Sequence, residues 1–323
     1  MVDRNTWSRR TELLALDHAA LTRMVQRGCP GAVLSQAALA EGGLANTNYR
    51  LELADGRELL LRMHVRSPSD GAKEWLLAER FGGRVPMPAM LHFEAHDADV
   101  GLPCTLMAWI EGERLELRAS GLDAAARRGL GRQIGAALAH IHAQTYPQTG
   151  FLDAGLKLVN PVPMGREGLL ACLDAWVVRG RGAARLGAGL TQDLLGFVRA
   201  NGGLLDGPAQ RPCLAHGDFG GANLLIDAED QLAAVLDWEF AFAGTPFFDL
   251  GNLLRAPLGA LEGFPEAVAE GYRATGAVLP EEWRLVAGLS DLFSWADFLN
   301  VEKASEGLIR DARAVVLSTL KLG

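Results

Sequence analysis

The residues best suited to chemistry in this 323-residue chain lie in one short segment, "LAHGDFGGANLLI". It places His216, Asp218 and Asn223 in a glycine-rich turn between two apolar flanks. Fourteen residues after Asn223, Asp237 follows an apolar run in "AVLDWEF". The intervening "NLLIDAEDQLAAVLD" predicts two strands joined by the turn "DAED". Such a hairpin would bring Asn223 and Asp237 together.

This combination of side chains fits phosphoryl transfer. One carboxylate and one amide oxygen are hard ligands of the kind that Mg²⁺ prefers, and they leave positions for water and phosphate oxygens. Asp218 would orient a hydroxyl and accept its proton, while His216 would brace the loop. Any one of these residues could be a simple turn former. Their joint spacing predicts catalytic roles for Asp218 and His216, with Asn223 and Asp237 as metal ligands.

The longer stretch "HGDFGGANLLI…VLDWEFAFAGTPFFDLGNLLR" resembles the aminoglycoside phosphotransferase and choline kinase family, relatives of the protein kinases. In that family the H-x-D-x-x-x-x-N loop carries the catalytic Asp, here Asp218, and a following D-x-x motif supplies an Mg²⁺-binding Asp, here Asp237. Asp249 falls on an Asp that braces the catalytic segment in the family, and a helix N-cap is its alternative role. The resemblance covers about Ser35 to Leu254 and implies ATP as the phosphoryl donor.

The first part of the chain should then hold the nucleotide. "EGGLANTNYRLEL" lacks the protein-kinase G-x-G-x-x-G, but "GGLANTNY" resembles the corresponding loop of choline and homoserine kinases. Glycines there allow close backbone approach to phosphates, and the polar residues after them offer donors. "TLMAWIEG" resembles the hinge whose backbone would meet adenine. The nucleotide-binding residues predicted from these two segments are Gly43, Asn46, Thr47, Asn48, Met107 and Trp109.

A cation on the third strand and a carboxylate on the next helix complete the expected nucleotide site. "LLLRMHVR" supplies Arg62 where many kinases carry Lys, and Arg keeps the charge and can contact phosphate bidentately. The helix segment "KEWLLAERF" offers Glu74, with Glu79 as the competing carboxylate. Glu74 is preferred because its spacing to "VPMP" resembles that of the family.

The acceptor is expected to be a small-molecule hydroxyl, because the segment between Asp237 and Asp249 is too short to bind a peptide. Glu239 lies among aromatic residues, where a carboxylate would suit an ammonium group, although packing between lobes is the alternative. We therefore expect acceptor contacts from Glu239, Trp238 and Asp249. Further acidic candidates, which could equally form a solvated helix face, are Asp291, Asp297 and Glu302.

Three functions follow from these patterns. The first is an ATP- and Mg²⁺-dependent kinase of an aminoglycoside-type antibiotic, chiefly by family resemblance. The second is a metabolic kinase of choline, homoserine or a sugar-like compound, which the loop "GGLANTNY" favours. The third is a catalytically silent nucleotide-binding protein, against which the joint presence of Asp218, Asn223 and Asp237 speaks.

The elements that must position these residues form two groups. We expect a helix within Trp7–Met24, a hairpin of Asn48–Leu53 with Glu58–Val65, a helix from Ser69, and strands in "PAMLHFEAH" and "PCTLMAWI". Helices dominate from Asp123 onward. The prediction is an α+β, two-lobed, protein-kinase-like fold. Its small antiparallel-sheet lobe spans 1–110, and its larger, mainly helical lobe spans 111–323.

Composition restricts the partners and the compartment. The formal net charge of −8 argues against a nucleic-acid partner, which demands clustered Lys and Arg. No apolar run is long enough for a membrane span or a signal peptide. The four cysteines are widely spaced and are expected to be reduced thiols. We expect a cytoplasmic protein, with both a monomer and a homodimer remaining open.

Overall fold

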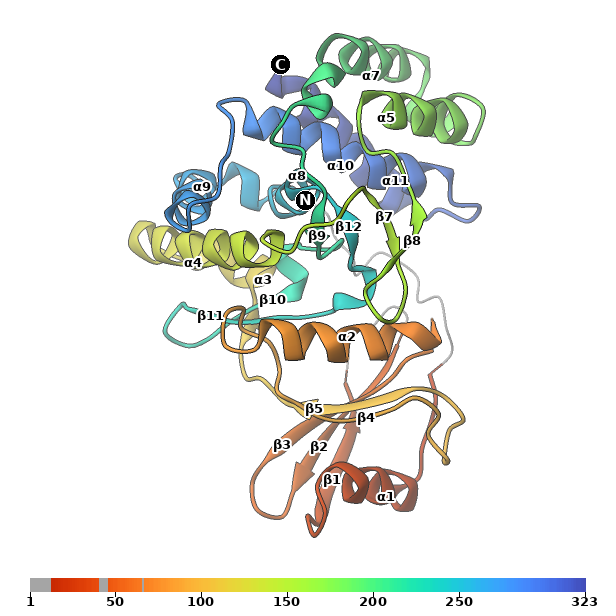
Figure 1. The fold of residues 1–323 in the computed structure, drawn as a ribbon, viewed down its shortest axis with the longest axis vertical. Helices are drawn as coiled ribbons and strands as arrows, with labels where there is room; N and C mark the ends of the chain where they lie inside the picture. Colours follow the sequence, from red (N-terminus) through yellow and green to blue (C-terminus); the bar gives the residue numbers. More distant parts are fainter. Residues whose placement is uncertain (1–12, 41–45, 66) are drawn as a thin grey trace.

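The structure is a computed structural model that describes residues 13–40, 46–65 and 67–323, and Figure 1 shows them arranged in two lobes. The smaller lobe is built on a five-stranded antiparallel sheet with strand order β1-β2-β3-β5-β4. Its elements, in chain order, are α1 (His18–Gly28), β1 (Leu34–Leu39), β2 (Thr47–Leu53), β3 (Glu58–Met63), α2 (Pro68–Phe81), β4 (Met90–Glu94) and β5 (Cys104–Ala108).

The two faces of this sheet have different roles. Along β2, Tyr49, Leu51 and Leu53 are buried in a core that α1 covers. Because successive side chains of a strand point to opposite faces, Asn48 lies on the other face. Asn48 pairs directly with Arg62 of β3, so both residues face away from the α1 core. The alternation of the hairpin thus places two predicted nucleotide-binding residues on one face.

The first helix begins later than its apolar spacing predicted. Residues 1–12 lie outside the described part of the chain, and Leu13–Asp17 are not helical. The helix starts at His18 because the Asp17 carboxylate accepts a hydrogen bond from the Ala20 N–H at 2.7 Å. Leu14 and Leu16 before it donate their N–H groups to side chains of β2 instead. Their contact with the sheet replaces the predicted extra helical turns.

The larger lobe is mainly helical and has two small sheets. Its strands are β6 (Glu113–Arg114), β7 (Gly150–Leu152), β8 (Leu158–Pro161), β9 (Cys213–Ala215), β10 (Leu224–Ile226), β11 (Leu232–Val235) and β12 (Phe242–Gly244). Figure 1 shows β10 and β11 of one sheet on the side that faces α2. Its α-helices are α3 (Leu115–Arg118), α4 (Ala124–His142), α5 (Arg166–Cys172), α6 (Gly182–Leu186), α7 (Ala188–Asn201), α8 (Pro246–Leu253), α9 (Phe264–Ala274), α10 (Trp283–Asn300) and α11 (Glu306–Thr319).

The predicted hairpin after the catalytic loop is present. β10 and β11 pair antiparallel, with Leu224 opposite Val235, and the "DAED" turn joins them. The glycine-rich "RGRGAARLGAGL" forms α6 and the start of α7, separated by Gly187 at φ 83°. The four cysteines, all within the described residues, form no disulfide. No helix of the described chain is long and apolar enough to cross a membrane.

Helix α2 connects the two lobes. Its Leu77 and Phe81, with Val85 just beyond, pack into the core of the larger lobe rather than against α1. The Phe81 ring stacks on Trp238 with 5.7 Å between the ring centroids. The polar residues of α2 therefore lie directly against the segment that follows Asp237. The boundary near residue 110 falls between β5 and β6, and it remains a prediction for the domain division.

Candidate active site

The predicted catalytic loop is a tight turn between β9 and β10. Gly217 has φ 85°, and a Cβ there would lie 2.3 Å from the carbonyl oxygen of Phe240. Glycine is therefore required at this position for both backbone conformation and space. A short 3-10 turn, Gly221–Asn223, then leads into β10. The loop holds His216, Asp218 and Asn223 next to one another, as the sequence spacing predicted.

Asp249 fixes the start of this loop. Its carboxylate accepts hydrogen bonds from the backbone N–H groups of His216 (2.7 Å) and Gly217 (2.9 Å). His142 Nε2 lies 3.1 Å from the same carboxylate. Asp249 is 0% exposed and lies inside α8, whose N-cap is Thr245. Asp249 is therefore not the helix cap considered above. Its burial also keeps it away from an acceptor. Its hydrogen bonds to the loop match the bracing position that the resemblance implies.

His216 connects the loop to the segment that carries Asp237. Its Nε2 lies 2.9 Å from the carbonyl oxygen of Leu236, and its Nδ1 accepts the backbone N–H of Asp218 at 3.2 Å. Because a carbonyl can only accept and an N–H can only donate, these partners require the proton on Nε2. The ring packs against Phe219 and Trp238. This geometry fits a bracing role.

Asn223 and Asp237 meet across the hairpin. Asn223 Nδ2 donates to the Asp218 carboxylate (2.9 Å) and to its backbone carbonyl (2.8 Å). The N–H of Leu236, the residue before Asp237, donates to the Asn223 carbonyl at 2.8 Å. Asp237 has φ 68° and a side chain that is 33% exposed. Because Nδ2 of Asn223 serves Asp218, its Oδ1 is the atom left to coordinate a cation.

Arg62 lies between the helix carboxylate and Asp237. Its Nη1 is 2.7 Å from Glu74 Oε1 and 3.0 Å from Asp237 Oδ1. Burial opposes the charge of the guanidinium, but Glu74, Asp237 and Glu239 outweigh that effect and raise the pKa of Arg62 above its ordinary value. Glu79 is exposed and instead accepts from Trp75 Nε1. Of the two candidates, the structure pairs Glu74 with Arg62.

The predicted nucleotide-loop residues are partly used within the protein. Gly43 lies outside the described residues. Asn46 donates to the Glu239 carboxylate at 2.6 Å, and Thr47 Oγ1 accepts the Leu14 N–H. Asn48 Oδ1 accepts from Arg62 Nε at 3.3 Å. These bonds tie Asn46, Thr47 and Asn48 to their surroundings at the start of β2.

The predicted hinge lies at the end of β5. Met107 is buried between β3 and β4, and the Trp109 N–H donates to the Glu58 carbonyl at 3.0 Å. The Trp109 ring lies under the Arg50 guanidinium, 4.4 Å from the ring centroid. The sheet therefore holds this segment in an extended form.

The donor set suits Mg²⁺ better than a softer metal. Within the described residues no group of three or more His, Cys, Asp or Glu side chains could hold a metal ion. One carboxylate and one amide oxygen are enough for Mg²⁺, which keeps several waters and binds substrate phosphates. Asp237 and Asn223, which lie at the same end of the β10–β11 hairpin and are linked by the Leu236 N–H, could supply those two oxygens.

The residues expected to contact the acceptor are buried. Glu239 is 4% exposed and bonds Asn46, and Trp238 packs between Phe81 and His216. Asp291 is also buried, where it pairs with Arg255. The expectation of a carboxylate among aromatics open to an ammonium group does not fit this geometry. Packing between the lobes, the alternative weighed from the sequence, describes Trp238 better.

Two buried polar residues near this site gave no sequence signal. Lys73 donates to the Glu239 carbonyl at 2.6 Å, although a helix lysine is normally solvated. His142 bonds both Asp249 and Tyr272, and its position on α4 offered no motif. Their partners lie more than 100 residues away, so only the folded chain reveals them.

Comparison with known proteins places this site in a family. The sequence model of a family described as "Phosphotransferase enzyme family" matches residues 36–289. The chain belongs to this family. A mouse protein, "Acyl-CoA dehydrogenase family member 10", is 28% identical over 217 residues, which are 64% of this chain but only 19% of that protein. The chain thus spans about a fifth of that relative's length.

Solved structures confirm the two-lobed, protein-kinase-like fold. The GDP complex of wild-type aminoglycoside 2'-phosphotransferase-IIIa superposes with a TM-score of 0.69 at 18% identity, covering 95% of this chain and 99% of that one. A putative aminoglycoside phosphotransferase from Ralstonia eutropha gives 0.66 at 17% identity, covering 95% and 98%. A putative fructosamine-3-kinase from Thermobifida fusca gives 0.58 at 20% identity, covering 92% and 98%.

Proposed function

We propose that this family member is an ATP- and Mg²⁺-dependent phosphotransferase that phosphorylates a hydroxyl of a small molecule. The observation that carries the proposal is the meeting of Asp218, Asn223 and Asp237 at one end of the β10–β11 hairpin, with Arg62 bonded to Asp237. These side chains come from segments far apart in the sequence, and an ordinary turn would not require all of them together. A cytoplasmic location fits such an enzyme.

Asp218 is the proposed catalytic base. It accepts the proton of the acceptor hydroxyl as the hydroxyl oxygen bonds to the γ-phosphorus and the bond from that phosphorus to the bridging oxygen breaks, leaving ADP. The hydrogen bond from Asn223 Nδ2 orients the Asp218 carboxylate. Asn223 Oδ1 and Asp237 would hold Mg²⁺, which supplies positive charge at the β- and γ-phosphates. Arg62, held by Glu74, fixes the Asp237 carboxylate.

Two acceptor classes follow from different observations. Structural relatives of the chain include complexes of aminoglycoside phosphotransferases with hygromycin B and with kanamycin, so an aminoglycoside-type antibiotic is the first class we propose. In that case the enzyme would confer antibiotic resistance. The second class is a choline-, homoserine- or sugar-like metabolite, which the resemblance of "GGLANTNY" to the corresponding loop of choline and homoserine kinases favours.

A small cavity beside the catalytic loop also bears on the acceptor. It has a volume of about 40 Å³ and is lined by Gly220 and Gly221 of the loop and by Asn252 and Arg255 at the end of α8. Arg255 already donates to the Asp291 carboxylate through its Nε and Nη2. A cavity of this size holds one small group. A neutral hydroxyl fits beside a guanidinium better than an ammonium group does, and both acceptor classes carry such hydroxyls.

The test is acceptor-dependent ADP release with Mg²⁺-ATP, with GTP as a parallel donor. The panel contains aminoglycosides, choline, ethanolamine, homoserine and simple sugars. We expect turnover with one class and its loss by roughly three orders of magnitude in Asp218→Asn. Turnover that survives in Asp218→Asn would refute the mechanism. Tight Mg²⁺-ATP binding without turnover on any acceptor would favour a silent nucleotide-binding protein.

A further inference from the structure

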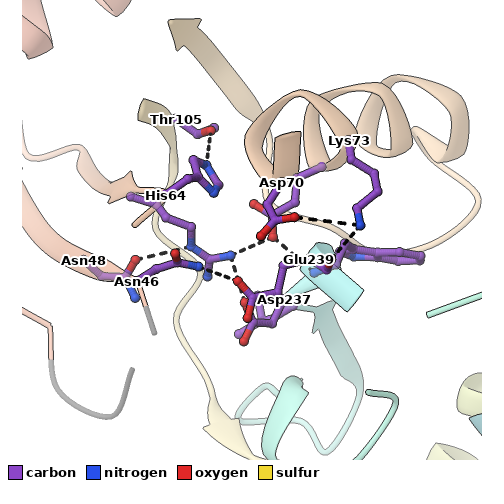
Figure 2. A network of polar contacts seen from close by, with 12 residues as sticks. Asn46, Asn48, His64, Asp70, Lys73, Thr105, Asp237 and Glu239 are labelled. Atoms are coloured by element: carbon purple, nitrogen blue, oxygen red, sulfur yellow. Dashed lines mark hydrogen bonds and ion pairs between the residues drawn. The ribbon is translucent and has the colours of Figure 1, made fainter. Parts of the chain in front are cut away.

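A buried lysine of α2 holds the backbone that follows Asp237. Figure 2 shows Lys73 reaching from α2 to Glu239. Its Nζ donates to the backbone carbonyls of Glu239 (2.6 Å) and Ala241 (3.3 Å), and the residue is 7% exposed. Asp70, one turn earlier on α2, lies 3.9 Å from the same ammonium group and balances its charge.

The neighbouring residue of α2 holds the same segment from its other end. Glu74 Oε1 accepts the backbone N–H of Trp238 at 3.1 Å while it also bonds Arg62. Two consecutive residues of one helix therefore bind the backbone on both sides of Trp238. A donor and an acceptor placed in this way fix the position and the direction of the short 3-10 turn Trp238–Phe240.

This turn has a reason to need external support. Asp237, directly before it, has φ 68° and ψ 59°, a left-handed conformation that residues other than glycine seldom adopt and keep only where the surroundings impose it. The carboxylate proposed to bind Mg²⁺ is thus carried by strained backbone. Lys73 and Glu74 supply bonds that hold the residues immediately after it.

Glu239 extends the same network to the nucleotide loop. Its carbonyl accepts from Lys73, while its carboxylate accepts from Asn46 Nδ2 at 2.6 Å (Figure 2). Asn46 Oδ1 in turn accepts the Val65 N–H just after β3. The residue expected from sequence to meet the acceptor therefore joins the start of β2 to the segment after Asp237.

We propose that Lys73 is a positioning residue for the metal site: it holds the turn after Asp237 so that the Asp237 carboxylate faces the cation and Arg62. The inference rests on the proposed function, because it assigns Asp237 to Mg²⁺. It makes Lys73 a determinant of the apparent Mg²⁺ affinity, without direct contact with the nucleotide or the acceptor.

The first test needs no activity. Lys73→Met keeps the length of the side chain but removes its donor. Lys157→Met is the matched control, because Lys157 is exposed in the turn between β7 and β8. Amide hydrogen exchange is measured on protein without metal or nucleotide. We expect residues 237–241 to exchange about tenfold faster in Lys73→Met, with α4 and α9 unchanged and the control unaffected. Unchanged exchange of residues 237–241 would overturn the proposal, and so would a uniform increase across the chain.

The second test follows Mg²⁺. The Mg²⁺ concentration for half-maximal ATP binding by calorimetry, and for half-maximal turnover once an acceptor is known, should rise about tenfold in Lys73→Met. Excess Mg²⁺ should restore activity, and the acceptor KM should stay within about twofold. If the folded yield is too low, Lys73→Gln, which keeps a shorter donor, should show a smaller shift in the same direction. A changed acceptor KM with normal Mg²⁺ dependence would refute the role of Lys73. Loss of turnover on all acceptors with the expected exchange change would refute only the proposed function.

Discussion

Replacing Glu74 with glutamine isolates the charge that holds Arg62. In the wild type, Arg62 Nη1 is shared between Glu74 at 2.7 Å and Asp237 at 3.0 Å, and both Arg62 and Glu74 are buried. Gln at position 74 keeps an oxygen that can accept from Arg62 and from the Trp238 N–H. It removes only the negative charge. Asp237 would then be the one carboxylate bonded to Arg62 among the contacts described, and Arg62 would compete more strongly with Mg²⁺ for it.

The size of the effect follows from the burial of the pair. A hydrogen bond between charged groups is worth about 1.5–3 kcal/mol, and breaking a buried pair costs about 3–5 kcal/mol. Because Gln keeps part of the contact, we expect a loss of about 2–4 kcal/mol in transition-state stabilisation. That corresponds to a fall of about 30- to 1000-fold in kcat/KM for ATP.

The assay is ADP release as a function of ATP concentration at saturating Mg²⁺ and acceptor. Glu79→Gln is the matched control, since Glu79 lies on the same helix, is exposed and bonds only to Trp75 among the contacts described. It should change kcat/KM by less than about twofold. A larger loss in Glu79→Gln than in Glu74→Gln would refute the assignment of the pair. Equal and small effects would show that Arg62 does not depend on a helix carboxylate.

Four further variants test other parts of the structure. Burial and the nearby Arg62 lower the pKa of His64 from 6.5 to about 3. Between these two pH values His64 is therefore protonated in the unfolded chain but neutral in the folded chain. Stability should therefore be lost as pH falls from about 6.5, by up to about 1.4 kcal/mol per pH unit, and His64→Gln should flatten this slope in urea unfolding at pH 7 and pH 5. A Cβ on Gly135 would lie 2.0 Å from the Val268 carbonyl oxygen, so Gly135→Ala should lower the free energy of unfolding by about 2–3 kcal/mol. Gly129 lies on the same helix with open space around it, so Gly129→Ala should raise that free energy by about 0.5–1 kcal/mol. Equal melting temperatures of the two variants would contradict the close crossing of α4 and α9. Asp249→Asn should lower kcat about 100-fold by leaving a buried N–H of the loop without its charged acceptor, with the acceptor KM nearly unchanged. A rise in acceptor KM alone would instead place Asp249 against the acceptor.

The sequence predicted best those parts of the site whose determinants are local. The β10–β11 hairpin follows from a polar turn between two apolar runs, and it alone brings Asn223 to Asp237. The tight turn at Gly217 follows from glycine spacing. The strand alternation of β2 and β3 placed Asn48 beside Arg62 for the same reason. Family resemblance added the fold and the order of the two lobes.

The sequence failed where a residue's role depends on distant partners. Glu239 looked like an open carboxylate among aromatics, but it bonds Asn46, 193 positions earlier. Lys73 gave no sequence signal, yet it bonds backbone carbonyls 166 and 168 positions later. The first helix starts at His18 rather than earlier because an N-cap and β2 side chains take the preceding N–H groups. Spacing along the chain carries no information about such contacts.

The described contacts hold the site in place from two sides. Asp249 and His142 fix the catalytic loop from within the larger lobe, whereas Glu74 and Lys73 fix the Asp237 segment from α2. Leu236 joins the two sides through its backbone alone, because its N–H donates to Asn223 and its carbonyl accepts from His216. Changes in α2 should therefore act first on the metal and nucleotide, and changes at Asp249 first on proton transfer. A movement of α2 reaches Asp218 indirectly, through this backbone link, the Trp238–His216 ring contact and the pairing of β12 with β9, so the orientation of α2 should set the proposed metal site more directly than the proposed catalytic base.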